Sequence, residues 1–217
     1  MVYRIARITA NLLLSLFTRR EIVGLENVPE PPYILATNHL SIFDLPLLLT
    51  VCPHTIRAFV ASKHRNNLLY APFMVITGAV WVRRGEVDRK ALRQALDVLE
   101  RGEVLGVAPE GTRARDARGL QKGKTGIAYL AARANVPIVP VGITGTESMN
   151  HDLPRLRRSR LRVTIGQPIR LPESGRVRGP KLEEYTDLVM RRIAELLPEA
   201  YRGVYTQETR QKSPSTG

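Results

Sequence analysis

The sequence is poor in cysteine and in aromatic residues. Its single cysteine is Cys52, so neither a disulfide within the chain nor a cysteine-rich metal site can form. Because Cys52 lies in an apolar stretch, we expect an inert, buried thiol and a reducing, cytoplasmic compartment. Aromatic residues make up 6% of the chain, and no stretch interleaves them with basic residues as a base-stacking surface would. This shortage shifts the expected partner from nucleic acid toward a membrane surface.

A long hydrophobic run is missing as well. Residues 1–20 read MVYRIARITANLLLSLFTRR, and Arg4, Arg7 and Asn11 interrupt the apolar residues, so the stretch falls short of the ~20 apolar residues that span a bilayer. No small-residue cleavage site follows, and a signal peptide is therefore not expected. Helical spacing brings the following apolar side chains near one side: Val2, Ile5, Ile8, Leu12 and Phe17. The pattern fits either an amphipathic helix in the membrane interface or a helix packed on the domain's own core.

Acidic residues are heavily outnumbered. The chain has 33 Lys+Arg against 20 Asp+Glu, which gives a net charge of +13, and such a surface attracts polyanions such as anionic lipid headgroups. The densest basic run, RLRRSRLR, contains Arg155, Arg157, Arg158, Arg160 and Arg162. It fits a contact with an anionic leaflet or a solvated basic face. We expect a peripheral protein at the cytoplasmic face of the cell membrane, with the anionic membrane surface as a partner.

Short β-branched runs alternate with helical patterns along the chain. The expected strands are 33–37, 56–61, 79–83, 104–108, 137–143 and 161–165, and the expected helices are 88–100, 123–134 and 181–197. This alternation predicts an α/β fold, a single domain with a mostly parallel central sheet flanked by helices and preceded by an N-terminal amphipathic helix. The predicted divisions are a helix over 1–20, the globular domain over 21–203 and a disordered polar tail over 204–217.

Residues 38–44, NHLSIFD, place polar groups directly after the expected strand 33–37. His39 and Asp44 would not share a face of one regular helix, because five residues correspond to about 140° of rotation. They can meet only if His39 lies on the turn before a helix whose first turn contains Asp44, and Pro46 favours a helix that begins there. A carboxylate bonded to one ring nitrogen would leave the other nitrogen free as a general base. Alternatively, Ser41 or Asp44 merely caps the helix.

Anion-binding residues stand at three further ends of expected elements. Residues 109–113, PEGTR, follow a strand and combine a flexible glycine, Gly111, with the phosphate-matching fork of Arg113. Residues 78–84, GAVWVRR, end in a pair of arginines, and residues 120–131, LQKGKTGIAYLA, place Lys122 and Lys124 before a helix. The GKT sequence is not a P-loop, because Arg118 stands where that motif needs glycine. A metal site at Glu147, His151 and Asp152 is not expected, because the ligand spacing is irregular.

Together these stretches resemble the glycerophospholipid acyltransferase family, particularly the 1-acyl-sn-glycerol-3-phosphate acyltransferases. NHLSIFD is similar to the family's N-H-x-x-x-x-D block, GAVWVRR to its second block with Arg84 as the block's arginine, PEGTR to the core of the third, and VPIVPVGI at 136–143 to the fourth. The resemblance covers about residues 21–170. The chain departs from it at Ala108, where the family often has an aromatic residue, and at Leu120 and Gln121, where the family often has Phe-Lys; the basic contact would then pass to Lys122.

The resemblance implies an acyl transfer from a thioester donor, acyl-CoA or acyl carrier protein, to the free hydroxyl of 1-acyl-sn-glycerol-3-phosphate in phospholipid biosynthesis, without a cofactor or metal. It makes His39 the general base and Asp44 the residue that orients it. The implied acceptor-binding residues are Lys63, Arg84, Glu110, Gly111, Thr112, Arg113 and Lys122. Glu110 would contact the acceptor or form an ion pair with Arg113. The alternatives are another acceptor (glycerol-3-phosphate, a lyso-ornithine lipid or another lysophospholipid) or a non-catalytic protein that binds anionic lipid or nucleic acid.

Overall fold

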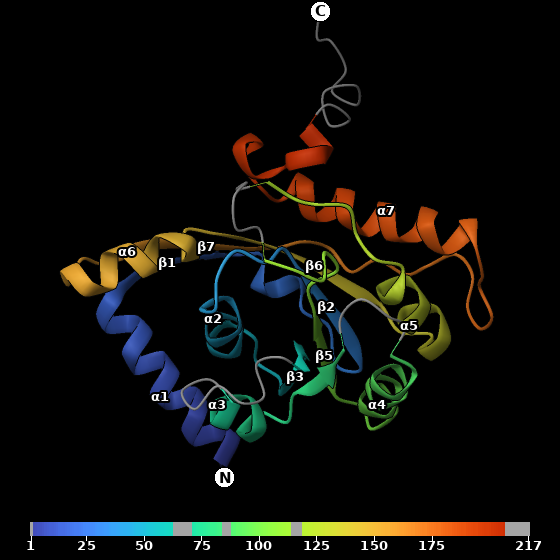
Figure 1. Ribbon diagram of the computed structural model, residues 1–217, viewed down its shortest axis with the longest axis horizontal. Coiled ribbons are helices and arrows are strands. Elements are labelled where there is room, and N and C mark those ends of the chain that lie inside the picture. Colours follow the sequence, from blue (N-terminus) through green and yellow to red (C-terminus); the bar gives the residue numbers. More distant parts are fainter. Residues whose placement is uncertain (1, 63–70, 84–87, 114–118, 207–217) are drawn as a thin grey trace, which may run out of the picture.

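A mixed β-sheet lies at the centre of the computed structural model, which describes residues 2–62, 71–83, 88–113 and 119–206. Its seven strands follow the order β1-β7-β6-β2-β5-β3-β4 (Figure 1). The strands are β1 (Thr18–Val23), β2 (Tyr33–Thr37), β3 (Ile56–Ala61), β4 (Val80–Val82), β5 (Val104–Val107), β6 (Ile138–Thr144) and β7 (Ser159–Ile165). The helices are α1 (Val2–Phe17), α2 (Asp44–Val51), α3 (Ala71–Ile76), α4 (Arg89–Glu100), α5 (Gly126–Ala134), α6 (Met149–Asp152) and α7 (Pro180–Glu195). The prediction of an α/β domain with a mostly parallel sheet and an N-terminal helix is confirmed.

Strand direction decides which loops meet. Strands β6, β2, β5, β3 and β4 run parallel to one another, whereas β7 is antiparallel to β6 and β1 is parallel to β7. The carboxyl ends of parallel neighbours lie at the same edge of a sheet, which is where sites form in α/β folds. The segments that follow β2, β5 and β6 are therefore brought side by side, although they are far apart in the sequence.

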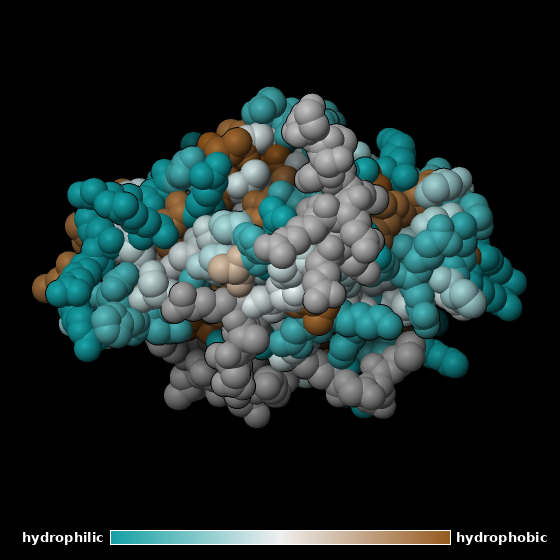
Figure 2. Space-filling model, turned by 90° about the horizontal axis from the view of Figure 1, so that it is seen from above, coloured by the Kyte–Doolittle hydropathy of each residue, from teal (hydrophilic) through white to brown (hydrophobic). Residues whose placement is uncertain are grey.

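Helices cover both faces of the sheet. In β2, Tyr33 and Leu35 pack with residues of α2 and α1 on one face, and Ile34 and Ala36 pack with α4, α5 and α7 on the other. This alternation is that of a central strand buried on both sides. Seen from the side of α7, hydrophilic residues cover both ends of the molecule, with hydrophobic residues in smaller groups between them (Figure 2). The core is thus divided into two apolar layers by the sheet.

Both ends of the chain differ from the predicted divisions. The N-terminal helix ends at Phe17 rather than at residue 20, because residues 18–23 form β1 along the outer side of β7. The charged sequence TRREIV gives no alternating apolar pattern, and its exposed position as an edge strand explains why. At the other end, Tyr205 is 4% exposed within the core, so the fold extends beyond residue 203. Residues 207–217 of the expected tail lie outside the described residues.

Helix α1 is buried on one side only. Ala10 and Leu14 are buried, and α1 packs mainly against α2. Its other apolar side chains are largely exposed, namely Val2, Ile5, Ile8, Leu12, Leu13 and Leu16. One side of the helix therefore packs on the domain and another carries uncovered apolar residues, and the expected contact with a membrane stays a prediction. Across the described residues, we find no helix with the length and apolar character required to traverse a membrane.

Part of the basic run 155–162 has a structural use. The Arg158 guanidinium donates to the carbonyl oxygens of Ser15 and Thr18, both at 2.8 Å. A cation at the end of a helix is favourable because it meets carbonyl groups that have no partner inside the helix. Arg162 forms an ion pair with Glu21 of β1 at 3.3 Å. These contacts fix α1 and β1 to β7, and they leave Arg157 and Arg160 exposed.

Candidate functional site

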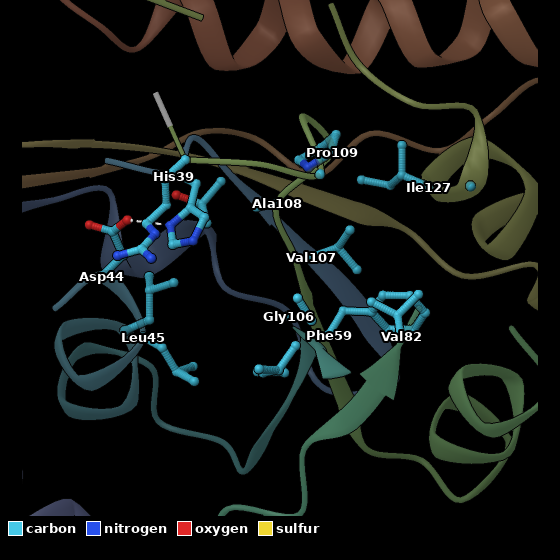
Figure 3. A pocket seen from close by; sticks show the side chains of 18 of the residues that line it. His39, Asp44, Leu45, Phe59, Val82, Gly106, Val107, Ala108, Pro109 and Ile127 are labelled. Carbon is cyan, nitrogen blue, oxygen red and sulfur yellow. Dashed lines mark hydrogen bonds and ion pairs between the residues drawn. The ribbon is translucent and has the colours of Figure 1, made fainter. Parts of the chain in front are cut away.

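His39 and Asp44 form a bonded pair at the carboxyl end of β2. His39 lies on the turn after the strand and Asp44 is the first residue of α2, so the pair has the arrangement that the sequence required. Nδ1 of His39 lies 2.7 Å from Oδ2 of Asp44. The carboxylate accepts the Nδ1–H bond, which leaves Nε2 as the ring nitrogen with a free lone pair. The imidazole is partly exposed and lines a large cavity (Figure 3).

Asp44 is held from two elements. Its Oδ2 also accepts the backbone N–H groups of Leu40 at 2.8 Å and Ser41 at 2.9 Å. Its Oδ1 accepts the hydroxyl of Thr146 at 2.5 Å. Asp44 does not cap α2, because these N–H groups precede it, and the residue at the cap position, Phe43, forms no side-chain cap bond. The carboxylate instead orients the turn that carries His39.

Thr146 reaches the pair because β6 ends beside β2. Gly145 joins β6 to Thr146 with φ of 90°, and a Cβ added at Gly145 would lie 2.0 Å from the carbonyl oxygen of Arg160. Only glycine fits this turn. The two strands are also joined by Asn38, whose side-chain amide donates to and accepts from the backbone of Ile143, both at 2.8 Å. Thr146 is fully buried, so its hydroxyl is fixed against Asp44.

Glu110 joins the pair to the loop after β5. Its Oε1 accepts the backbone N–H of His39 and its Oε2 accepts that of Gln121, both at 3.0 Å. The side chain is buried, and burial raises the pKa of Glu110 above its ordinary value, although both backbone bonds lower it. Within the described residues Glu110 makes no ion pair with Arg113, so of the two alternatives for this residue the contact with the acceptor stays a prediction. Glu110 positions the His39 turn and the segment before Lys122.

Cationic side chains approach the pair from the 109–113 loop and from the 120–125 segment. Gly111, with φ of 69°, lies so close to Lys124 that an added Cβ would be 2.9 Å from its Cε. The Gly111 N–H donates to the carbonyl oxygen of Ala108 at 3.0 Å, so this amide is already bonded within its own turn. Arg113, Lys122 and Lys124 line the same cavity as His39. Their positive charge can hold a phosphate beside the imidazole.

The cavity has a volume of about 1820 Å³. Leu45 of α2, Phe59 of β3, Val82 of β4 and Val107 of β5 form part of its wall, and His39 and Asp44 lie at one side of it (Figure 3). Residues of α1 continue the wall, among them Val2, Ile5 and Leu13. The cavity wall thus combines apolar side chains with the His39–Asp44 pair, several cations and the carboxylates of Asp88 and Glu183. Apolar walls with a small number of polar groups are typical of ligand sites.

The structure brings together most of the predicted residues and adds two. Gly111, Arg113 and Lys122 line the cavity with His39 and Asp44, whereas Glu110 and Thr112 are not among the described lining residues. Lys63 and Arg84 lie outside the described residues. Thr146 was not predicted as a site residue, and Lys124, although noted before the helix, was not among the implied acceptor-binding residues. The position of Thr146 directly after a predicted strand was the available signal, and for Lys124 it was the neighbouring Lys122.

Comparison with known proteins gives a consistent result. Residues 19–144 match the family described as Acyltransferase. A 1-acyl-sn-glycerol-3-phosphate acyltransferase of Chlamydomonas reinhardtii is 32% identical over 88% of this chain and 57% of its own length. One from Bacillus subtilis is 22% identical over 90% of this chain and 96% of its own. The crystal structure of the 1-acyl-sn-glycerophosphate acyltransferase PlsC from Thermotoga maritima superposes with a TM-score of 0.69 at 25% identity, covering 89% of this chain and 79% of that one.

Several relatives are longer than this chain. The match covers 57% of the Chlamydomonas protein and 44% of the 1-acyl-sn-glycerol-3-phosphate acyltransferase of Saccharomyces cerevisiae. The chain thus spans about half the length of these curated relatives. The segment that matches the Acyltransferase family, residues 19–144, includes the His39–Asp44 pair, the 109–113 loop and strand β6.

Proposed function

Because this chain belongs to the Acyltransferase family, we propose that it moves a fatty acyl group from a thioester donor to the free hydroxyl of 1-acyl-sn-glycerol-3-phosphate, giving phosphatidic acid. The observation that carries the proposal is a bonded imidazole–carboxylate pair beside three cations, Arg113, Lys122 and Lys124, in one apolar cavity. A base, a phosphate site and space for acyl chains are the parts that this reaction needs. The relatives' names supply the acceptor.

The pair supplies the proton transfer. Nε2 of His39 takes the proton from the acceptor hydroxyl, and the hydroxyl oxygen attacks the thioester carbonyl carbon. The C–S bond then breaks, and the leaving thiolate takes the proton back from the imidazolium as the free thiol. Asp44 stabilises the imidazolium while it exists, since its carboxylate bonds Nδ1. No protein nucleophile takes part. The buried thiol of Cys52 packs in the core beside α2 and is not among the described residues that line the cavity.

The cations fix the acceptor. A phosphate held by Arg113 and Lys124 beside Gly111 would place the glycerol hydroxyls toward the turn that carries His39. We propose that Lys63, Arg84, Thr112 and Lys122 add to this phosphate site, as the resemblance implies. Glu110 contributes by fixing the His39 turn relative to the backbone at Gln121, because its carboxylate accepts an N–H bond from each. The apolar walls of β3, β5 and α2 would accept the acyl chains.

We propose that the exposed side of α1 lies in the membrane interface. Ile5 and Leu13 line the cavity and are each 55% exposed, so the cavity opens onto the uncovered apolar side of the helix. A lipid could then pass from the leaflet to His39 without crossing water. An amphipathic helix bearing basic residues such as Arg4 suits an anionic, cytoplasmic leaflet.

The test is an acceptor panel with a single labelled acyl-CoA. Release of free thiol should depend on 1-acyl-sn-glycerol-3-phosphate, with formation of labelled phosphatidic acid. Glycerol-3-phosphate, a lyso-ornithine lipid and lysophosphatidylcholine serve as the competing acceptors, and acyl carrier protein replaces CoA in a parallel series. Faster transfer to one of the other acceptors would replace the acceptor in this proposal. No acceptor-dependent thiol release from either donor would favour a non-catalytic anionic-lipid binding protein.

A further inference from the structure

We infer that a second group of arginines, on α4 and α5, binds the phosphates of the coenzyme A portion of the acyl donor. This inference rests on the proposed function and goes beyond it by naming the donor and its site. The arginines are Arg89 and Arg93 of α4 and Arg133 of α5, all in the wall of the cavity that contains His39. They belong to different elements from the cations that we assign to the acceptor phosphate.

The wall is formed by one side of each helix. Positions 89, 92, 93 and 96 of α4 follow helical spacing and all line the cavity, so they occupy a single face of the helix. The opposite face is fixed in the core by Ala91, Ala95, Val98 and Leu99. On α5, Tyr129, Leu130 and Arg133 also line the cavity, and α4 packs against α5. The result is an apolar surface of Leu92, Leu96 and Tyr129 with arginines along it.

Within the described residues, no carboxylate neutralises these arginines. Their three side chains form no hydrogen bond or ion pair in that part of the chain, although Glu183 also lines the cavity. Asp88, which also lines the cavity, is committed elsewhere: its Oδ1 accepts the N–H of Ala91 at 3.1 Å and its Oδ2 accepts that of Arg83 at 2.9 Å. Like charges without partners repel one another, so an anion bound among them gains the attraction of all three.

The positive surface continues past α5. A smaller hollow of about 430 Å³ shares Tyr129, Arg133 and Leu182 with the large cavity, and its other lining residues include Arg176 and Arg178. Within the described part of the chain these two guanidinium groups also form no hydrogen bond or ion pair with a carboxylate. The arginines of the two hollows therefore form a longer positive surface than the binding of a single phosphate group requires.

The chemistry of the donor fits this layout. In acyl-CoA the thioester is joined through the pantetheine arm to a diphosphate, and a further phosphate is attached to the ribose. The arm is mostly uncharged and would lie on Leu92, Leu96 and Tyr129, with the thioester toward His39. Arginine forks match phosphate oxygens in a bidentate manner. The donor arginines lie on α4 and α5, whereas the cations assigned to the acceptor lie on the 109–113 loop and the 120–125 segment. The two phosphate groups of the reaction, donor and acceptor, would thus have separate sites.

The experiment compares two donors, one of which lacks the phosphorylated nucleotide of CoA. The double variant Arg93→Ala/Arg133→Ala is assayed with a long-chain acyl-CoA and with the same acyl group on pantetheine, and CoA binding is measured by calorimetry. We expect the KM for acyl-CoA and the Kd for CoA to rise about 10- to 100-fold, since a lost charge-assisted contact weakens binding about tenfold. The KM for acyl-pantetheine and for the lysophospholipid should stay unchanged. Lys90→Ala is the matched control, because Lys90 is an exposed cation of α4 outside the described cavity lining.

Different failures have different meanings. Equal losses with both donors, a raised KM for the lysophospholipid, or an equal effect of Lys90→Ala would each overturn the assignment. So would a loss confined to acyl carrier protein as donor, with CoA binding intact. If the unmodified protein binds CoA, the double variant does not, and neither donor supports transfer, then the arginine site stands and the proposed acyl transfer fails. Circular dichroism of each variant confirms that the exposed substitutions leave the fold intact.

Discussion

The imidazole–carboxylate pair and the cationic wall of the same cavity are built in opposite ways. Asp44 is buried and accepts bonds from His39, Leu40, Ser41 and Thr146. By contrast, the charged ends of Arg113, Lys122 and Lys124 have no partner among the described residues. The His39–Asp44 pair is therefore fixed before any substrate binds, whereas the three cations can still form hydrogen bonds and ion pairs with a ligand.

The difference follows from what each region has to do. Proton transfer needs atoms within hydrogen-bond reach and a defined tautomer, so its geometry must be set by the folded protein. A phosphate carries its negative charge on several oxygens, and flexible cationic side chains can adjust to bind it. Bonds between these cations and other protein groups would compete with the phosphate and weaken its binding. Buried hydrogen bonds therefore hold His39 in place, whereas the cations remain in contact with solvent.

The largest effect should come from the base. His39→Ala removes the proton acceptor while the cations remain, so the transfer rate should fall about 10²–10⁴-fold. Binding of the lysophospholipid, measured by its Kd, should change little. His151→Ala provides the control, because this exposed histidine is outside the described cavity lining. Near-normal transfer by the His39 variant would show that the fixed region is not the reacting one.

A smaller effect should follow from loosening the pair without removing it. Thr146→Val keeps the shape of the side chain but leaves Oδ1 of Asp44 without its hydroxyl donor, and we expect kcat to fall about tenfold with an unchanged acceptor KM. Thr146→Ser should restore the rate because it keeps the hydroxyl.

A double-mutant cycle separates positioning from general stability. If Thr146 acts through Asp44, then Thr146→Val should have little further effect on kcat in an Asp44→Asn background. Losses that simply add, or a serine variant as slow as the valine variant, would contradict this relation. Thermal unfolding of each variant gives the stability change independently.

The cationic region should respond in KM rather than in kcat. Arg113→Ala is expected to raise the KM for 1-acyl-sn-glycerol-3-phosphate about tenfold, because one charge-assisted contact is lost and the base is untouched. Monoacylglycerol, which lacks the phosphate, is the control acceptor, and its KM should not change. If the KM for the lysophospholipid is unchanged, its phosphate binds elsewhere.

The smallest effect concerns stability and pH at Glu110, which joins the two regions. Burial raises the pKa of this carboxyl in the folded state, so its contribution to stability is present below the ordinary carboxyl pKa of about 4.3 and is lost as pH rises through the raised value. Glu110→Gln removes this titration. The free energy of unfolding of the native protein should therefore fall relative to that of the variant as pH rises above about 4. Denaturant melts across this range measure the difference, and parallel curves would contradict the assigned pKa direction.

Much of the fold was predictable from local patterns. Strands β2 and β3 have the predicted bounds, and α4 begins directly after Asp88, whose carboxylate accepts the N–H of Ala91. These elements carry strong β-branched runs or a clear helical spacing, which tertiary contacts reinforce. Strand β1 was missed because TRREIV is charged, and its strand conformation depends on pairing with β7. The helix-ending contacts of Arg158 with Ser15 and Thr18 were likewise invisible, since they join residues far apart in the chain.

The site shows the same division. The need for His39 to precede a helix opened by Asp44 follows from five-residue spacing and Pro46, and the structure has this arrangement. The predicted contacts of Glu110 were different, because a carboxylate that stands beside Arg113 in sequence is directed by folding to the backbone of His39 and Gln121.

By itself the sequence determined the alternating α/β elements and the position of the imidazole and carboxylate around one turn, because each depends on residues close together in the chain. It also determined the excess of cations, which depends on composition alone. Only the tertiary structure decided that β6 lies beside β2, and hence that Thr146 bonds Asp44 across 102 positions. It also decided that Arg93 and Arg133 share the cavity of His39. The physical reason is that strand order and helix packing are set by burial of the whole core, which no local pattern records.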